Sequence, residues 1–226
     1  MTERKVTGVL QSDWSAAIPD YPIASGWTRD GGALVLCDSA GGVYAFDSQQ
    51  GELLWSEQSA HEGGALAMSM HPGETLFATA GQDGKILIWD LSEARPRCCI
   101  EIGSGWVENL LWSPDGAQLA SSNGREIQIF AADGTEQWRS DEHLSTVSAL
   151  GWLNSEEVVS TCYGRVTIFD AATGEHNERF EWKGSLVSLA LSPDGDVIAC
   201  GSQDNSVHFW RRSTGEDSMM SGYPGK

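Results

Sequence analysis

Three side chains in the first half of the chain have the types that nucleophilic catalysis requires. His61 would act as a base, the hydroxyl of Thr79 as a nucleophile, and the carboxylate of Asp83 would orient the base. The three residues are separated along the chain, so catalysis requires a fold that brings them together. The elements that position them therefore decide whether the set does chemistry or holds strands together.

The other reactive side chains form no pattern of a catalytic or metal site. Cys98 and Cys99 are adjacent, and no second pair of cysteines or histidines stands at the spacing of zinc ligands. The glycine pairs lie in turns and form no phosphate-binding loop. The carboxylates are scattered over turns, which is typical of a solvated acidic surface rather than a catalytic pair. The sequence predicts a protein that is not an enzyme, with no cofactor and no metal.

The composition predicts a folded protein with an acidic surface. The chain has 226 residues, of which 40% are hydrophobic, and 32 Asp and Glu against 14 Lys and Arg give a formal net charge of −18. This charge repels phosphate backbones and anionic lipids, and we find no local basic patch, so neither nucleic acid nor a membrane is the expected partner. The five cysteines are odd in number and mostly lie in apolar runs, which favours free thiols in the cytoplasm.

An internal repeat organises the chain. Apolar runs end in an aromatic residue at a spacing of about 40 residues, at Phe46, Trp89, Phe130, Phe169 and Trp210. An Asp follows directly at three of these positions: Asp47, Asp90 and Asp170. A turn precedes each aromatic at a nearly constant distance, and two of these turns read Ser-Pro-Asp-Gly, a sequence suited to tight turns. Two short strands fit between each turn and its aromatic, so we predict an all-β fold.

These features resemble WD40 repeats. The Ser-Pro-Asp-Gly turns, the segment Gln-Asp-Gly-Lys-Ile-Leu-Ile-Trp-Asp at 82–90 and the unit length carry the resemblance, which covers residues 14–226. It implies a single β-propeller domain over residues 1–226, with about five four-stranded blades present of a ring of six or seven. The expected repeat units are residues 14–55, 56–97, 98–138, 139–178 and 179–220, and residues 221–226 would begin a sixth unit.

Both ends of the chain bear on whether this ring is complete. The last residues stand at the phase where a sixth unit begins, and residues 3–11 are expected to form an outer strand. We therefore predict a propeller truncated at its C-terminus that self-associates; a closed five-bladed ring and two pairing half-rings stay open. Residues 182–187 and 218–226 also resemble bacterial stand-alone WD40 proteins, some of which are encoded near metal-handling GTPases.

The WD40 resemblance implies a structural hydrogen-bond set of His, Ser or Thr, Asp and Trp in each unit. The second unit has all four as His61, Thr79, Asp83 and Trp89, which favours a structural role for them over catalysis. The other units depart from the pattern. Their residues at these positions are Ile18, Cys37 and Phe46 in the first unit; Gly103, Asn123 and Phe130 in the third; His143, Ser160, Tyr163 and Phe169 in the fourth; and Trp182, Cys200, Asp204 and Trp210 in the fifth.

The resemblance also implies a docking face on one rim of the propeller. The partner-binding residues expected there are Gln82, Trp106, Glu108, Tyr163, Trp182, Lys183 and Gln203. Aromatic side chains at such places anchor interfaces, although Trp106 and Trp182 could instead fill gaps left by missing histidines. We therefore expect a non-catalytic scaffold that docks a protein partner on its rim. The alternative is an enzyme or a small-ligand or metal-handling protein that uses the central channel.

Overall fold

The computed structural model describes residues 14–222, which form eighteen β-strands and no helix. The all-β prediction is therefore confirmed for this part of the chain. Across the same residues, no helix is long and apolar enough to span a membrane. The outer strand predicted over residues 3–11 lies outside the described residues, and so do residues 223–226 of the predicted sixth unit.

The first twelve strands form three antiparallel sheets of four strands, and each sheet is one blade. Blade 1 consists of β1 (Pro22–Trp27), β2 (Ala33–Asp38), β3 (Val43–Asp47) and β4 (Leu53–Glu57). Blade 2 consists of β5 (Ala65–Met70), β6 (Leu76–Gly81), β7 (Lys85–Asp90) and β8 (Pro96–Glu101). Blade 3 consists of β9 (Val107–Trp112), β10 (Gln118–Asn123), β11 (Glu126–Ala131) and β12 (Glu136–Arg139).

Blades 4 and 5 share a single sheet because two long strands each serve twice. β14 (Glu157–Asp170) pairs its first half with β13 (Ala149–Trp152) and its second half with β15 (His176–Leu191). The first half of β15 is the outer strand of blade 4, and its second half pairs with β16 as the inner strand of blade 5. The remaining strands of blade 5 are β16 (Val197–Ser202), β17 (Val207–Arg211) and β18 (Asp217–Met220).

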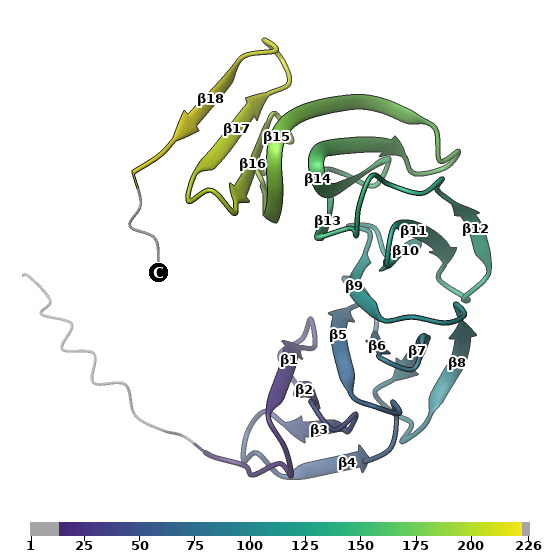
Figure 1. Ribbon diagram of the computed structural model, residues 1–226. Coiled ribbons are helices and arrows are strands. Elements are labelled where there is room, and N and C mark those ends of the chain that lie inside the picture. Colours follow the sequence, from purple (N-terminus) through teal and green to yellow (C-terminus); the bar gives the residue numbers. More distant parts are fainter. Residues whose placement is uncertain (1–13, 223–226) are drawn as a thin grey trace, which may run out of the picture.

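The five blades stand side by side along an arc, with β1, β5, β9 and β13 on its inner side (Figure 1). Apolar clusters fill the junctions between neighbouring blades. At the first junction, Val35 and Val43 of blade 1 pack against Phe77 and Trp89 of blade 2, and all four side chains are fully buried. A strand buried on both faces in this way reads as a continuous apolar run. The predicted β-propeller fold is confirmed.

The Asp that follows the terminal aromatic sets the turn into the outer strand. A carboxylate oxygen of Asp47 accepts the backbone N–H of Gln49 at 2.8 Å, and Asp170 accepts that of Thr173 at 2.8 Å. Asp90 makes the same contact in blade 2 with Ser92, at 2.9 Å. Hydrogen bonds from the turn hold the pKa of Asp47 and Asp170 below the usual range. These caps reverse the chain, so the outer strand lies against the strand that ends in the aromatic.

The Ser-Pro-Asp-Gly turns close the hairpin between the first and second strands of a blade. In blade 3, Asp115 accepts the Ser113 hydroxyl at 2.6 Å and the backbone N–H of Ala117 at 3.0 Å. Gly116 adopts a φ of 76°, and a Cβ there would come within 2.3 Å of the His71 imidazole of blade 2. Glycine is required at this position by both its backbone conformation and the close approach of the neighbouring blade.

Candidate functional site

The complete hydrogen-bond set of blade 2 runs from an indole to a carboxylate. The Nε1–H of Trp89 donates to the Thr79 hydroxyl oxygen at 2.9 Å, and this hydroxyl donates to Nε2 of His61 at 2.8 Å. The Nδ1–H of His61 then donates to Asp83 at 3.1 Å. This chain of donors assigns a neutral imidazole with its proton on Nδ1.

Burial gives this set a structural role. Thr79 is 0% exposed and His61 is 1% exposed, so the hydroxyl that would act as a nucleophile cannot meet a substrate. Its oxygen already has two partners within the junction of blades 1 and 2. The four residues come from different places in the unit, because His61 precedes β5, Thr79 lies on β6, Asp83 in the following turn and Trp89 on β7. The set therefore ties the connection between blades to the strands of blade 2.

An outer-strand tryptophan closes the same junction from the outer edge of blade 1. The Nε1–H of Trp55 on β4 donates to the backbone carbonyl of Leu91 in blade 2 at 2.7 Å. The Trp55 ring stacks on Phe77 and Trp89, with ring centroids 6.2 and 5.8 Å apart. Trp55 is therefore part of the contact between blades, beyond its predicted place on an outer strand.

The same contact recurs at two other places in the described chain. In each, the ring of a Trp packs against the terminal aromatic of the blade that follows it in the chain, and its Nε1–H donates to the carbonyl two residues after that aromatic. The pairs are Trp138 with the carbonyl of Ala171 at 2.7 Å and Trp14 with that of Ser48 at 3.1 Å. Sequence analysis missed this contact, although the shared phase of Trp14, Trp55 and Trp138 ahead of the terminal aromatics is a signal that could have found it.

Blade 4 keeps part of the set and replaces the rest with backbone. Nε2 of His143 lies 2.8 Å from the Ser160 hydroxyl, and its Nδ1–H donates to the backbone carbonyl of Arg125 at 2.9 Å. Tyr163, which stands near the Asp position in the sequence, is 53% exposed and takes no part in the set. The Arg125 carbonyl oxygen of blade 3 thus accepts the imidazole N–H that the Asp carboxylate accepts in blade 2.

The sets of blades 1 and 3 are incomplete, and strand register corrects one predicted position. Leu36 pairs with Tyr44 as Thr79 pairs with Leu87, so Leu36 takes the Ser/Thr position rather than Cys37. Cys37 instead faces blade 2 in the apolar cluster. In blade 3, which has Gly103 where the His would stand, the hydroxyl of Ser121 is buried with no hydrogen-bond partner.

Blade 5 replaces the histidine contact with a contact between two rings. Trp182 stands at the His position and packs against His208, with ring centroids 3.5 Å apart and ring planes tilted by 35°. The Trp182 ring also packs against the apolar cluster between blades 4 and 5, and its Nε1 is buried without a partner. His208, which sequence analysis did not single out, bonds the Ser206 hydroxyl through Nε2 at 2.9 Å. The packing of Trp182 therefore agrees with the alternative that its ring fills the gap left by a missing histidine.

The predicted partner-binding residues lie in two separate groups. Gln82 and Trp106 line a hollow between blades 2 and 3 together with Glu62 and Lys85. Trp106 is 53% exposed, in contrast to the partly buried Trp182. The second group, Trp182 and Lys183, lines a hollow with Leu144 and Arg165. The three remaining residues are exposed outside both hollows: Glu108, Tyr163 and Gln203.

Two family models match the chain. Residues 176–211 match the model described as WD domain, G-beta repeat, and residues 39–178, more than half of the chain, match the model described as outer membrane protein assembly factor BamB. The chain belongs to the family of this second model, and it is a β-propeller of the WD40 type. The role in outer-membrane assembly belongs to BamB itself and is not carried over to this chain.

The relatives of this WD40 propeller are longer proteins. It is 24% identical over 161 residues to the serine-threonine kinase receptor-associated protein of Gallus gallus, a match of 70% of this chain and 46% of that protein. It is 26% identical over 151 residues to the small ribosomal subunit protein RACK1 of Schizosaccharomyces pombe, covering 67% of this chain and 38% of that protein. The chain therefore spans less than half the length of these relatives.

A solved structure shares the fold. A chain in the crystal structure of the mitotic checkpoint complex superposes with a TM-score of 0.78 at 21% identity, over 91% of this WD40 propeller and 65% of that chain. At this level of identity the likeness concerns the fold alone. Within residues 14–222, no group of three or more His, Cys, Asp or Glu side chains is placed to hold a metal ion.

Replacing Trp89 by Ala should cost more stability than replacing Trp55. Loss of the buried Trp89 ring should cost about 3 to 5 kcal/mol and leave the Thr79 hydroxyl short of a donor. Trp55→Ala should cost about 2 kcal/mol, since the half-buried Trp55 ring loses its stacking and one hydrogen bond. Urea unfolding of both variants measures the difference, and equal losses would contradict the central place of Trp89.

Stability should fall as the pH drops below about 6.5. Burial lowers the pKa of His61 and of His143 below the ordinary value of 6.5. The unfolded chain therefore takes up protons first, so the stabilisation is complete above about pH 6.5 and is lost as the pH falls through it. Melting temperatures between about pH 7.5 and 5.5 measure this slope. The slope should flatten in the double variant His61→Gln/His143→Gln, and an unchanged slope would contradict the assignment.

The two rim tryptophans should differ in their effect on stability. Trp182→Ala should cost about 2 kcal/mol, because it removes a ring packed on His208 and the cluster of blades 4 and 5. Trp106→Ala should change stability by less than about 0.5 kcal/mol, because its ring is half exposed. Chemical denaturation of the two variants, monitored by circular dichroism, checks this contrast. A large loss in Trp106→Ala would place its ring in the core.

Proposed function

We propose that this chain is a non-catalytic scaffold that docks a protein partner on the rim formed by the connections between blades. The observation that carries the proposal is the exposed Trp106 beside the hollow that it lines with Gln82, Glu62 and Lys85. A half-exposed indole flanked by an amide and by charges of both signs fits the anchor of a protein interface, where a large apolar surface is desolvated and its edge is hydrogen-bonded.

The relatives support a role in protein association. One is named for association with a serine-threonine kinase receptor, and another relative, from Schizosaccharomyces pombe, is named Shk1 kinase-binding protein 15 and is 26% identical over 177 residues. RACK1 is named as a protein of the small ribosomal subunit. These names describe three different assemblies, so they support docking as the shared activity and leave the partner of this chain to experiment.

The docking surface that we propose is the hollow between blades 2 and 3. Gln82 and Lys85 flank the turn between β6 and β7, and Trp106 lies just before β9 of the next blade. The backbone N–H of Ile102 donates to the carbonyl of Gly84 at 2.9 Å and holds this turn against the connection to blade 3. A Cβ at Gly84 would lie 2.1 Å from the carbonyl oxygen of Gly103, so the contact is too close for any side chain. The connection that carries Trp106 is therefore packed closely against the turn between β6 and β7.

Loss of the Trp106 ring should abolish partner capture without unfolding the protein. An interface anchor of this kind contributes about 2 kcal/mol or more, which is about thirtyfold in affinity. Affinity capture with the full chain, followed by titration of each captured protein, should show this loss in Trp106→Ala. Tyr21→Ala is the matched control, because Tyr21 is an exposed aromatic residue ahead of β1 and away from this hollow. Undiminished binding by folded Trp106→Ala, or turnover of a small substrate, would contradict the proposal.

A further inference from the structure

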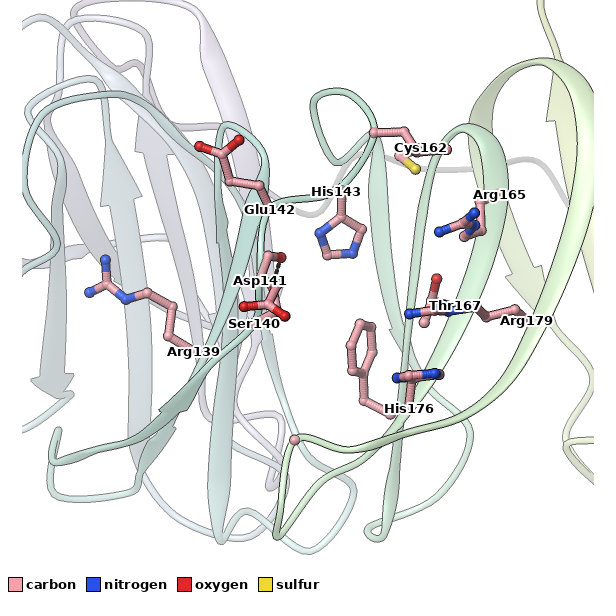
Figure 2. Close-up of a pocket in the computed structure, with 13 residues that line it drawn as sticks. Arg139, Ser140, Asp141, Glu142, His143, Cys162, Arg165, Thr167, His176 and Arg179 are labelled. Atoms are coloured by element: carbon pink, nitrogen blue, oxygen red, sulfur yellow. Dashed lines mark hydrogen bonds between the residues drawn. The ribbon is translucent and has the colours of Figure 1, made fainter.

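A polar cavity of about 210 Å³ lies between the outer parts of blades 3 and 4 (Figure 2). His143 stands on one side of it, in the connection that leaves blade 3. Blade 4 supplies the other wall, with Arg165 and Thr167 from β14 and with His176 and Arg179 from β15. Figure 2 shows these side chains turned toward one another across the cavity. None of the residues that line this cavity lines the hollow between blades 2 and 3 that was proposed for docking.

Strand register explains why polar groups meet here. Thr167 pairs with Arg179 across β14 and β15, and Arg165 lies two residues earlier on the same face. In blade 2 the equivalent cross-strand pair is Leu87 with Cys99, and Leu87 belongs to the apolar cluster of the junction. Blade 4 thus places a hydroxyl and a guanidinium where blade 2 has an aliphatic side chain and a thiol.

Blade 3 provides an internal comparison for the charges. Its β12 has Arg139 at the position of Arg179, and that guanidinium is neutralised by Glu126 at 3.4 Å and Glu136 at 3.2 Å. By register, the positions of these two glutamates hold Arg165 and His176 in blade 4. Arg139 therefore has two acidic neighbours in blade 3, whereas its counterpart in blade 4, Arg179, has basic residues at the same two positions. In a chain of net charge −18, this is a local reversal of sign.

The basic groups of the cavity have unused hydrogen-bonding capacity. Within residues 14–222, neither the Arg179 guanidinium nor the Thr167 hydroxyl has an ion pair or a side-chain hydrogen bond. Arg165 pairs with Glu181 at 3.5 Å, but Glu181 is 78% exposed and so holds it weakly. Nε of Arg165 is buried and has no partner. Burial lowers the pKa of His143, and the charges of Arg165 and Arg179 lower it further.

Two acidic residues line the cavity without cancelling its charge. Asp141 and Glu142 belong to the wall on the blade 3 side, opposite Arg165 and Arg179 (Figure 2). Glu142 forms an ion pair with Arg125 at 3.2 Å. The lining thus has three guanidinium groups, Arg139, Arg165 and Arg179, against these two carboxylates, which is a positive excess of one. Arg139 and Arg165 also pair with glutamates outside the lining, whereas Arg179 has no ion pair within residues 14–222.

We propose that this cavity binds a phosphate-type oxyanion, with Arg165 and Arg179 as charged donors and the Thr167 hydroxyl as a neutral donor. The donors come from adjacent strands and line the same cavity, which suits a tetrahedral group with several oxygens. Guanidinium forks bind such groups through paired N–H donors. Free phosphate and a phosphorylated side chain of a partner both present this chemistry.

Nuclear magnetic resonance of the full ¹⁵N-labelled chain tests the site directly. Inorganic phosphate is titrated at constant ionic strength while the Nε–H signals of the arginines are followed. The signal of Arg165 should move in a saturable way, because its Nε–H has no partner to exchange for the ligand. A blocked phosphothreonine amide in a second titration distinguishes the sources. Saturation by it indicates a phosphorylated side chain, and saturation by inorganic phosphate alone indicates the free ion.

Three variants separate specific binding from general charge. Arg179→Gln should weaken phosphate binding about tenfold or more, and Thr167→Val, which keeps shape and charge, should weaken it severalfold. Arg95→Gln is the control, since it removes one positive charge from an exposed turn of blade 2 and should bind phosphate as the unmodified chain does. Circular dichroism confirms that each variant is folded. Binding to the unphosphorylated threonine amide, an equal loss in Arg95→Gln, or no saturation up to about 20 mM phosphate would overturn the proposal.

Discussion

The structure depends on the burial of one aromatic ring at each junction between blades. A single four-stranded sheet cannot cover its own two faces, so each blade is stable only against its neighbours. The ring that ends the third strand of a blade lies against the preceding blade, and at two of the junctions between blades an outer-strand tryptophan closes over it, Trp55 over Trp89 and Trp138 over Phe169. The indole N–H of that tryptophan then donates to a backbone carbonyl of the neighbouring blade, which ties the two blades together at the junction.

This constraint explains why the hydrogen-bond set varies from blade to blade. A buried Trp89 brings an N–H that must be satisfied, and Thr79 with His61 satisfies it. A phenylalanine at the same position has no such group. Where Phe169 replaces the tryptophan, Ser160 needs only His143, and a backbone carbonyl suffices for the other side of that imidazole. The packing is common to the blades, whereas the polar set follows from which aromatic ring is present.

Some positions at the junctions and on the rim are not needed to hold the blades together and can therefore carry functional side chains. The junction of blades 3 and 4 is held by Trp138, Phe169 and the His143 contacts, so the outer positions of β14 and β15 are not needed for cohesion. Those positions carry Thr167 and Arg179, where blade 2 has Leu87 and Cys99. On the rim, likewise, Trp106 is exposed because the connection before β9 is held by backbone contacts and not by its ring. The packing that all blades share stabilises the fold, and the positions where one blade differs from the others are the candidate functional sites.

The repeat, the all-β fold, the turns that form the blades and the complete hydrogen-bond set around Trp89 could all be predicted from the amino-acid sequence. These follow from local signals, because turn residues act on their own dihedral angles and an apolar period marks strands wherever they pack. Only the folded structure shows that Cys37 faces the next blade and that the Trp182 ring packs against His208. It also revealed a basic cavity in a chain where the sequence shows no basic patch. The reason is register, since a slip of one residue moves a side chain to the other face, and pairing between strands decides which distant side chains meet.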